Sequence, residues 1–411
     1  MKTIKESERE TPVIEEVDVV VAGGGPAGVA AAVSAARNGA KTLLIERYGY
    51  LGGLATGGLV ICLDETDRYG FGICKEAVER LLEHEAAEVI KPREKPGIWM
   101  EGTSPTGAEA CRFDPEILKY IFSEMISESG AILLLHSLIV DSVTDDGKVR
   151  GLIIEGKSGR QAVLGKVFVD ATGDADLAAL SGAPFNVDRH PWGINLEFRI
   201  GNVDVKRALK WKEDNPEPYR ELMNRLKTEV GMVSWGKSLY ENVVWGHGPH
   251  FYDADGLDVR DLTRVEVESR RRIVAAFKFF KKHIPGFEKA FLIDIASQIG
   301  VRETRRIIGE YILTKEDEMT GRDFEDNIAR GIFGIPYRCL IPKNVDGLLV
   351  AGRCISTTHE AQGAIRNIPP CMITGQAAGT AAALSVREKV NPQELNVGLL
   401  QETLRKQGVR L

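Results

Sequence analysis

The sequence predicts an α/β fold in which one domain has a central parallel sheet and a β-meander, and carries an inserted α+β domain. An apolar, β-branched run at 17–24 is followed by a helix pattern at 26–39 and a second apolar run at 41–46, so a β-α-β unit occupies about 30 residues. Strand patterns return at 149–174 and 347–352. The 411 residues exceed one typical domain, and the different pattern between these strand-rich parts indicates an insertion.

The elements of the first half follow from local signals. Pro26 suits a first helical turn, the alanines after it allow close packing, and Gly39 is a helix stop. Apolar residues at helical spacing predict an amphipathic helix over 114–130. The runs at 131–143 and 149–174 are typical of strands joined by glycine-bearing turns.

The second half is predicted in the same way. A long charged helix is expected over 258–283, with strands at 290–298 and 306–313. The strand GLLVAG at 347–352 precedes a helix of small residues that is expected to begin near Pro369 and to close the chain.

Composition limits the class of protein. The 59 acidic and 53 basic residues leave a net charge of −6, which argues against a nucleic-acid surface over the whole molecule. No apolar run approaches the roughly 18 residues of a membrane span, and the charged N-terminal segment lacks the apolar core of a signal peptide. Six dispersed cysteines without a CxxC pair indicate buried, reduced thiols in a cytoplasmic protein and no metal site.

A G-x-G-x-x-G motif lies between the first strand and the first helix. Gly23 allows a tight turn, Gly25 lets a pyrophosphate approach the backbone, and Gly28 allows close packing of helix and strand. The helix N-terminus offers free N–H groups to phosphates. Glu46, at the end of the second strand, is expected to accept ribose hydroxyls, so the unit predicts a dinucleotide site.

A second glycine cluster follows Glu46 directly, at Gly49, Gly52, Gly53, Gly57 and Gly58. A cluster of glycines costs ordering entropy, so it needs a reason. A flavin nucleotide is longer than NAD and requires bare backbone further along the chain, which favours FAD. A flexible loop is the alternative.

Several segments together resemble a known family. GGGPAG and ERYGYLGGLAT resemble FAD-dependent oxidoreductases of the glutathione-reductase-like superfamily, which are distantly similar to fumarate reductase flavoproteins. Similar motifs of that family are VFVDATGDADLAALSGAPF, IGVRETRRIIGEYILT, DVRDLTRVEVESRRRI and the segment 348–385. The match covers most of residues 17–390, although ARGIFGIPY at 329–337 lacks a longer segment of the family and so predicts a more open pocket. The motifs and the resemblance together predict FAD-binding residues Gly23, Gly25, Pro26, Ala27, Gly28, Glu46, Arg47, Gly52, Gly53, Leu54, Ile139, Ala171, Thr172, Gly173, Gly352, Arg353, Ile373 and Gly375.

The last predicted helix also has a physical reason to face a flavin. Pro369 and Pro370 preset its start, and its N-terminus favours the negative charge of a reduced flavin, which would raise the reduction potential. Gly375 and Gly379 allow close packing, and helix packing alone is the alternative role.

The catalytic candidates are His359, Arg302 and Arg353. His359 lies between two segments expected to face the flavin, and the arginines suit an anionic substrate because their forked donors pair with carboxylates. The alternatives are a structural hydrogen bond for His359 and an interdomain salt-bridge network for the arginines, which we favour for Arg305 and Arg306. His136 is interpreted as structural, and His247 and His250 as pocket residues or exposed loop. The basic face at 270–282 is interpreted as a solvated helix.

The resulting hypothesis is an FAD-dependent oxidoreductase that transfers hydride between flavin N5 and an unidentified small molecule, with an anionic substrate favoured. FAD-binding parts are expected at 1–185 and 335–411, with a substrate or cap domain at 186–334. The electron acceptor stays open, and a homo-oligomer is compatible with the sequence. The alternatives are a flavin-dependent RNA-modifying enzyme and a non-catalytic binding protein on the same fold.

Overall fold

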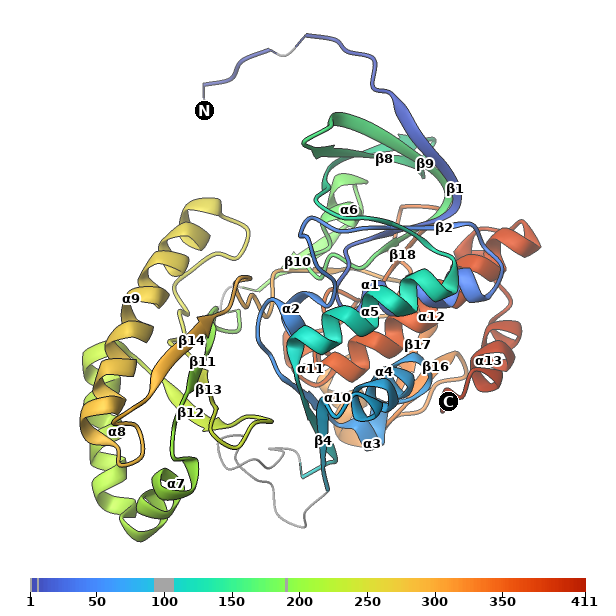
Figure 1. Cartoon of the computed structure of the whole chain (residues 1–411). Coiled ribbons are helices and arrows are strands. Elements are labelled where there is room, and N and C mark those ends of the chain that lie inside the picture. Colours follow the sequence, from blue (N-terminus) through green and yellow to red (C-terminus); the bar gives the residue numbers. More distant parts are fainter. Residues whose placement is uncertain (1, 6, 92–106, 189–190) are drawn as a thin grey trace.

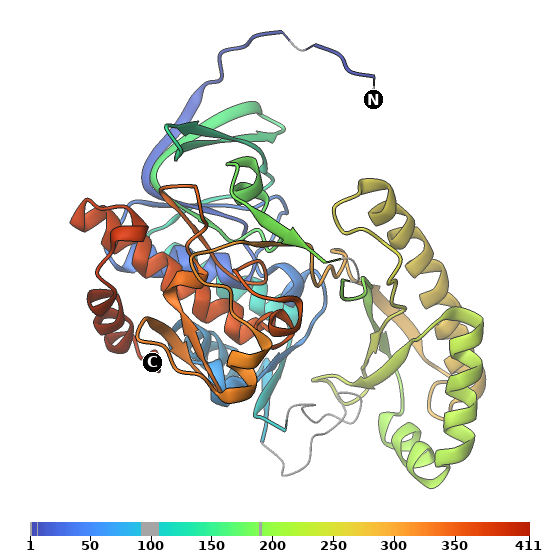
Figure 2. The ribbon, with the colours of Figure 1, turned by 180° about the vertical axis from the view of Figure 1, so that it is seen from behind.

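The computed structural model describes residues 2–5, 7–91, 107–188 and 191–411, which form two lobes (Figure 1). The smaller lobe, on the left of Figure 1, is built from the chain between β10 (Phe185–Val187) and β15 (Arg305–Ile307). These two strands pair antiparallel where the chain leaves and re-enters the larger lobe. The view from behind in Figure 2 shows the same separation.

The larger lobe is organised by one sheet with the strand order β6-β2-β1-β9-β8-β7, in which β18 also pairs with β9. The long strand β9 joins two patterns, because its first half pairs antiparallel with β8 and its second half pairs parallel with β1 and β18. The predicted parallel sheet and β-meander are thereby confirmed. The strands are β1 (Val13–Ala22), β2 (Thr42–Ile45), β6 (Ile132–Leu134), β7 (Leu138–Asp145), β8 (Lys148–Gly156), β9 (Gly159–Asp170) and β18 (Leu348–Val350).

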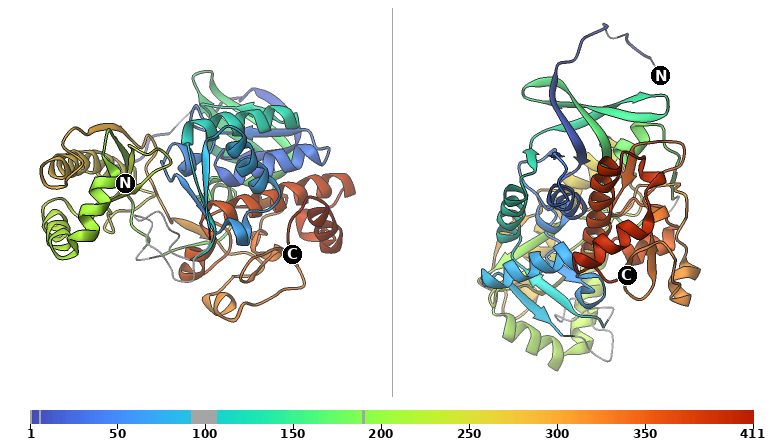
Figure 3. Two further views of the ribbon diagram at one scale, coloured as in Figure 1. Left: turned by 60° about the horizontal axis from the view of Figure 1, so that its bottom comes forward. Right: turned by 90° about the vertical axis from the view of Figure 1, so that its right-hand side faces the viewer.

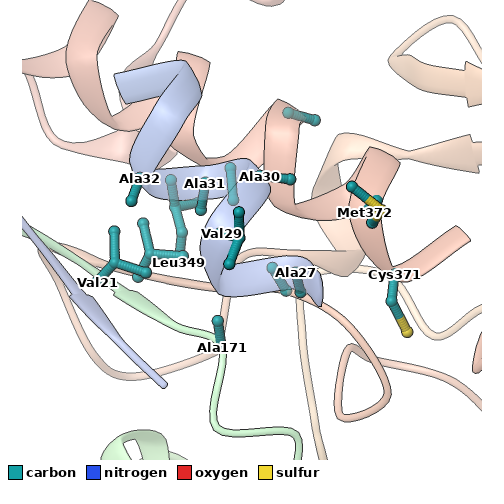
Figure 4. Close-up of a cluster of buried hydrophobic side chains, with 14 of the residues drawn as sticks. Val21, Ala27, Val29, Ala30, Ala31, Ala32, Ala171, Leu349, Cys371 and Met372 are labelled. Atoms are coloured by element: carbon teal, nitrogen blue, oxygen red, sulfur yellow. The ribbon is translucent and has the colours of Figure 1, made fainter. Parts of the chain in front are cut away.

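Two helices of small residues, α1 (Pro26–Arg37) and α12 (Ile368–Glu388), lie side by side in the larger lobe (Figure 3). They approach so closely that a Cβ on Gly375 would overlap the backbone of Ala27, and one on Gly379 would overlap the backbone of Ala31. Figure 4 shows the resulting core, where side chains of α1 lie between the sheet and α12. Close helix packing is therefore one established role of these glycines.

The predicted helix at 114–130 is α5 (Pro115–Ser129). It begins because the Asp114 carboxylate accepts hydrogen bonds from the backbone N–H groups of Glu116 and Ile117, and it ends at Gly130, which is left-handed.

The smaller lobe is a four-stranded antiparallel sheet with helices against one face (Figure 1). Along β11, Phe198 and Ile200 point into the core of this lobe, so Glu197 and Arg199 lie on the opposite face. Gly246 on the neighbouring strand has no side chain because the Phe198 ring occupies that space. The elements are β11 (Glu197–Gly201), α7 (Val205–Asp214), α8 (Pro216–Val230), β12 (Ser234–Lys237), β13 (Val244–His247), α9 (Val259–His283) and β14 (Phe291–Ile295).

Three element predictions are corrected. The run at 131–143 is divided, because His136 has a φ of 55° that interrupts the strand between β6 and β7. The strand predicted at 306–313 is limited to β15, because Gly309 and Leu313 bridge to other segments. The helix α13 (Val397–Lys406) follows α12, so α12 does not close the chain.

The remaining elements complete the larger lobe. The chain after β15 returns to the larger lobe, since Leu313 and Phe333 belong to the core of that lobe. The segment at 329–337 forms part of the β16–β17 hairpin. All six cysteines are buried and unpaired. Within the described ranges, no helix is both long and apolar enough to cross a lipid bilayer. These elements are α2 (Gly53–Thr56), β3 (Cys62–Asp64), α3 (Thr66–Tyr69), α4 (Gly72–Glu83), β4 (Ala87–Ile90), β5 (Ala110–Phe113), α6 (Asp176–Leu180), α10 (Lys315–Thr320), β16 (Asn327–Arg330), β17 (Gly334–Pro336), α11 (His359–Ile365), and the 3-10 turns Tyr337–Cys339 and Pro392–Glu394.

Candidate functional site

A cavity of about 710 Å³ lies at the carboxyl ends of the parallel strands and is lined by both lobes. Ligands of open α/β sheets bind at this edge, because the strand-to-helix turns meet there. Most of the residues predicted to contact FAD line this cavity. They are Gly23, Gly25, Pro26, Ala27, Glu46, Arg47, Gly53, Leu54, Ile139, Ala171, Thr172, Gly173, Gly352 and Arg353.

The turn between β1 and α1 uses its three glycines in three ways. Gly23 has a φ of 97°, and a Cβ there would lie 2.7 Å from the Ala171 carbonyl oxygen. A Cβ on Gly28 would overlap the Gly23 carbonyl oxygen, so that glycine serves packing. A Cβ on Gly25 would meet no protein atom within 4 Å, because it would project into the cavity. The turn thus leaves open backbone at the N-terminus of α1, as phosphate binding requires.

Glu46 lies at the end of β2 and is 7% exposed. Its carboxylate accepts a hydrogen bond from the Gly24 backbone N–H at 2.6 Å and another from the Tyr48 N–H at 2.8 Å. Burial raises the pKa of this carboxyl. These bonds hold Glu46 beside the glycine turn, where a carboxylate oxygen can still accept a ribose hydroxyl.

The second glycine cluster has mixed roles, which corrects its interpretation as a continuous stretch of cofactor-facing backbone. Gly53 lines the cavity, and a Cβ there would lie 3.1 Å from Gly25 Cα. Gly52 has a φ of 99° and donates its N–H to the Gly24 carbonyl at 2.8 Å, which joins the two glycine segments. The others make room for protein atoms: Gly49 for the His136 ring, Gly57 for the Tyr50 ring and Gly58 for the Leu54 backbone.

The A-T-G-D segment after β9 is held by a buried carboxylate. Asp170 accepts hydrogen bonds from the Thr172 N–H at 3.0 Å, the Thr172 hydroxyl at 2.7 Å and the Ala178 N–H at 2.8 Å. Burial raises the pKa of Asp170 to about 6. Gly173, with a φ of 80°, leaves space for the Arg353 guanidinium, which contacts Asp174 at 3.3 Å.

Of the described residues of α12, only those near its N-terminus line the cavity. Asn367, Ile368 and Cys371 line the cavity at the start of α12. Of the described residues predicted to bind FAD, Gly28, Gly52, Ile373 and Gly375 are not in the cavity wall. They lie one layer behind it, in the turns and in the α1–α12 contact.

The predicted catalytic residues separate. Arg302 and Arg353 line the cavity, whereas His359 is not among the described residues that do so. His359 stacks on Trp192 with ring centroids 4.7 Å apart, and its Nδ1 lies 2.7 Å from Glu303 Oε2. Arg305 pairs with Asp176 at 2.8 Å and so joins the two predicted domains, whereas Arg306 pairs at 2.8 Å with Glu303 of its own segment.

The smaller lobe supplies a polar wall that sequence reasoning largely missed. Asn195, Glu197, Trp245, His247 and His250 line the cavity beside Arg302. Burial, together with His247 and Arg302, lowers the pKa of His250 to about 3, so its ring is neutral at neutral pH. The one feature of the sequence that could have indicated this wall is Glu197, an acid among the apolar residues of NLEFRI. The sequence indicates His247 and His250 as pocket residues or exposed loop, and it gives no prediction for Asn195, Glu197 or Trp245.

Four arginines line the cavity: Arg47 lies next to Glu46, and the other three are Arg302, Arg353 and Arg366. Burial, together with the positive charges of Arg302 and Arg353, lowers the pKa of Arg366 to about 10. Among the described residues, no carboxylate lies within ion-pair distance of Arg366, whose ring neighbour is Trp192. An unpaired buried charge is costly, so an anion bound beside this guanidinium would stabilise it.

The chain was compared with known proteins. A model of the family described as FAD dependent oxidoreductase matches residues 18–334 and 330–404. Similar solved structures include a geranylgeranyl bacteriochlorophyll reductase-like protein from Thermoplasma acidophilum, at 16% identity and a TM-score of 0.53 over 96% of this chain and 84% of that chain. Another is p-nitrophenol 4-monooxygenase from Pseudomonas putida DLL-E4, at 13% identity and a TM-score of 0.53 over 95% and 84% of the two chains. A third is the myxobacterial chondrochloren halogenase, at 12% identity and a TM-score of 0.51 over 96% and 79%.

These structural similarities show a shared fold, while the family match extends over most of the chain. The open backbone at Gly25, the carboxylate of Glu46 and the cavity between the lobes fit an extended dinucleotide. The chain belongs to the FAD dependent oxidoreductase family, and FAD is its cofactor.

Proposed function

We propose that this enzyme transfers hydride between N5 of its flavin and a small anionic substrate bound where the two lobes meet. The observation that carries the proposal is that one cavity joins the glycine turn to Arg302, Arg353 and Arg366. Bound FAD supplies a two-electron acceptor or donor. We also propose placement in the glutathione-reductase-like superfamily, on the resemblance of the motifs.

The residues divide between holding FAD and holding substrate. Gly23 and Gly25 with the N-terminus of α1 would hold the pyrophosphate, and Glu46 the ribose. Gly53 would leave room for the flavin. The smaller-lobe wall, together with Arg353 and Arg366 of the larger lobe, would bind substrate and exclude water, as ligand sites between domains commonly do.

We propose that the inserted domain ends earlier than the sequence indicated. It would extend from β10 to β15, and residues 307–334 would belong to the FAD-binding domain, because Ile307, Leu313, Ile328 and Phe333 pack in the larger core. The smaller lobe has its own core, which includes Phe198, Trp235 and Phe280.

The buried thiols favour a small-molecule substrate over RNA modification by a reactive cysteine. Cys62 and Cys371 line the cavity, but burial raises the pKa of Cys62 well above its ordinary value and that of Cys371 to about 12. A nucleophilic thiol needs a depressed pKa instead.

The test is anaerobic bleaching of the flavin absorbance at about 450 nm by a panel of hydroxy acids, amines and reduced nicotinamides. Bleaching by at least one anionic member supports the proposal. A yellow protein that none of these reductants bleaches, although dithionite does, would contradict it. A colourless protein unable to take up FAD would instead favour a binding protein on this fold.

A further inference from the structure

A buried carboxylate and an imidazole face each other in the smaller lobe, on the wall of the cavity. Glu197 on β11 and His247 on β13 are directly paired across the two strands. His247 Nδ1 lies 2.6 Å from Glu197 Oε1 but is not aligned for a hydrogen bond, and the Asn195 amide donates a hydrogen bond to the same oxygen at 2.6 Å. The Glu197 side chain is 3% exposed, whereas the His247 side chain is 29% exposed. Arg302 can only donate, and its Nη2 lies against His247 Nε2, so Nε2 is the acceptor and the imidazole proton is on Nδ1 beside the carboxylate.

The other ring nitrogen of His247, Nε2, faces the Arg302 guanidinium. Arg302 Nη2 lies 3.4 Å from His247 Nε2 and 3.5 Å from His250 Nε2. Its Nη1 donates to the Gly193 carbonyl at 2.6 Å and to the Asn195 amide oxygen. Glu197 Oε1 makes an ion pair with Nη2 at 4.0 Å, while the hydrogen bonds of the guanidinium go to neutral groups. A proton acceptor and an anion-binding group are thus fixed side by side.

We propose that His247 is the base that deprotonates the hydroxyl of a 2-hydroxy carboxylate whose carboxylate is bound by Arg302, with Glu197 as a positioning residue. The proposal rests on the proposed function, because the flavin must receive the electrons. The hydroxyl proton passes to His247 Nε2, and the C–H bond breaks with its electron pair passing to FAD. The C–O bond becomes a carbonyl, so the substrate loses two electrons and the flavin gains them.

The spacing of the two groups specifies the substrate class. A carboxylate on Arg302 places its α-substituent within reach of His247 Nε2, because the two protein nitrogens are 3.4 Å apart. The groups that face His247 are Glu197, Arg302, the neutral His250 and the Trp245 ring. An ammonium of an amino acid would meet the Arg302 charge, whereas a neutral hydroxyl would not. The geometry therefore favours a hydroxy acid over an amino acid.

Oxalate tests anion binding at this site without the reaction. We expect the FAD-loaded enzyme to bind oxalate, measured by calorimetry, because a carboxylate can pair with the Arg302 guanidinium. Arg302→Lys is expected to bind oxalate at least about tenfold more weakly, whereas His247→Asn should bind it with nearly wild-type affinity. His84→Asn, on the exposed end of α4, is the matched control and should behave as wild type. Unchanged oxalate affinity in Arg302→Lys would overturn the proposal.

Rapid reduction of the flavin by D- and L-2-hydroxy acids, from lactate to 2-hydroxyglutarate, tests the step itself. His247→Asn should lower the limiting reduction rate by about 10²–10⁴-fold at wild-type FAD content. Glu197→Gln should lower that rate with little change in the dissociation constant for oxalate, and should move the acidic limb of the rate profile to lower pH. If Glu197 were purely structural, Glu197→Gln would instead lower the FAD content or the melting temperature. Bleaching by reduced nicotinamides but by no hydroxy acid would overturn this inference and leave the proposed function standing, while no bleaching by any anionic reductant would overturn both.

Discussion

Gly25 is the position where a single side chain should remove FAD without harming the fold. Its φ of −68° and ψ of −177° suit any residue, and a Cβ there meets no protein atom within 4 Å. The space that a side chain would enter is the cavity at the N-terminus of α1. Gly25→Ala and Gly25→Val should therefore fold like the wild type, and compete only with the cofactor.

The expected loss follows from the bonds that a displaced pyrophosphate gives up. A hydrogen bond to a charged group contributes about 1.5–3 kcal/mol, so loss of two backbone N–H bonds costs about 3–6 kcal/mol. That cost corresponds to about 10²–10⁴ in the dissociation constant of FAD. Gly25→Ala, with one methyl group, should fall at the lower end, and Gly25→Val at the upper end.

The assay is the FAD-to-protein ratio after purification, followed by titration of FAD into the deflavinated protein. Circular dichroism of the apoprotein gives the melting temperature. Gly398→Ala, in the first turn of α13 outside the cavity wall, is the control with the same chemical change. Stoichiometric FAD with wild-type affinity in Gly25→Val would refute the reasoning, and so would an apoprotein that no longer folds.

Three further predictions concern stability and charge. Gly375→Ala should destabilise the protein by at least about 1–3 kcal/mol in urea unfolding, because its Cβ would lie 2.7 Å from the Ala27 carbonyl carbon and force α12 from α1. The Asp170 pKa is raised from 3.8 to about 6, so the stability that this group contributes is present below about pH 4 and is lost as the pH rises through 6. That component amounts to about 3 kcal/mol at most, and Asp170→Asn should remove it from the pH dependence of the unfolding free energy. Arg366→Met should raise the apoprotein's unfolding free energy by about 1–3 kcal/mol and weaken oxalate binding at least about tenfold, because it removes a cation without a counterion; unchanged stability and affinity would show that Arg366 is already neutralised.

The elements with strong local signals were predictable from the sequence. Pro26 and Gly39 delimit α1 within a few residues, and Asp114 and Gly130 delimit α5, because helix ends depend on groups within one turn. The helix α13 was missed even though Leu400 and Leu404 have helical spacing, because that amphipathic segment is short.

Most residues predicted to bind FAD line the cavity, as do the predicted Arg302 and Arg353, whereas Glu197 was not predicted. The glycine turn and Glu46 occupy one β-α-β unit, so their proximity follows from chain connectivity. His359 looked equally promising but turns toward Glu303 and Trp192, since neighbours from other elements decide where a side chain points. Gly49 and Gly57 likewise serve the rings of His136 and Tyr50, which no spacing reveals.

The sequence by itself determined that a strand-turn-helix unit with bare backbone would bind a dinucleotide, because glycine conformation, helix capping and strand periodicity are properties of a few consecutive residues. Only the tertiary structure decided which groups share the other end of the cavity. Glu197 and His247 are 50 positions apart, and they meet through the register of two antiparallel strands while Arg302 arrives from a third segment. Such encounters depend on how sheets and lobes pack, and that packing is a sum over the whole chain rather than a property of any one stretch.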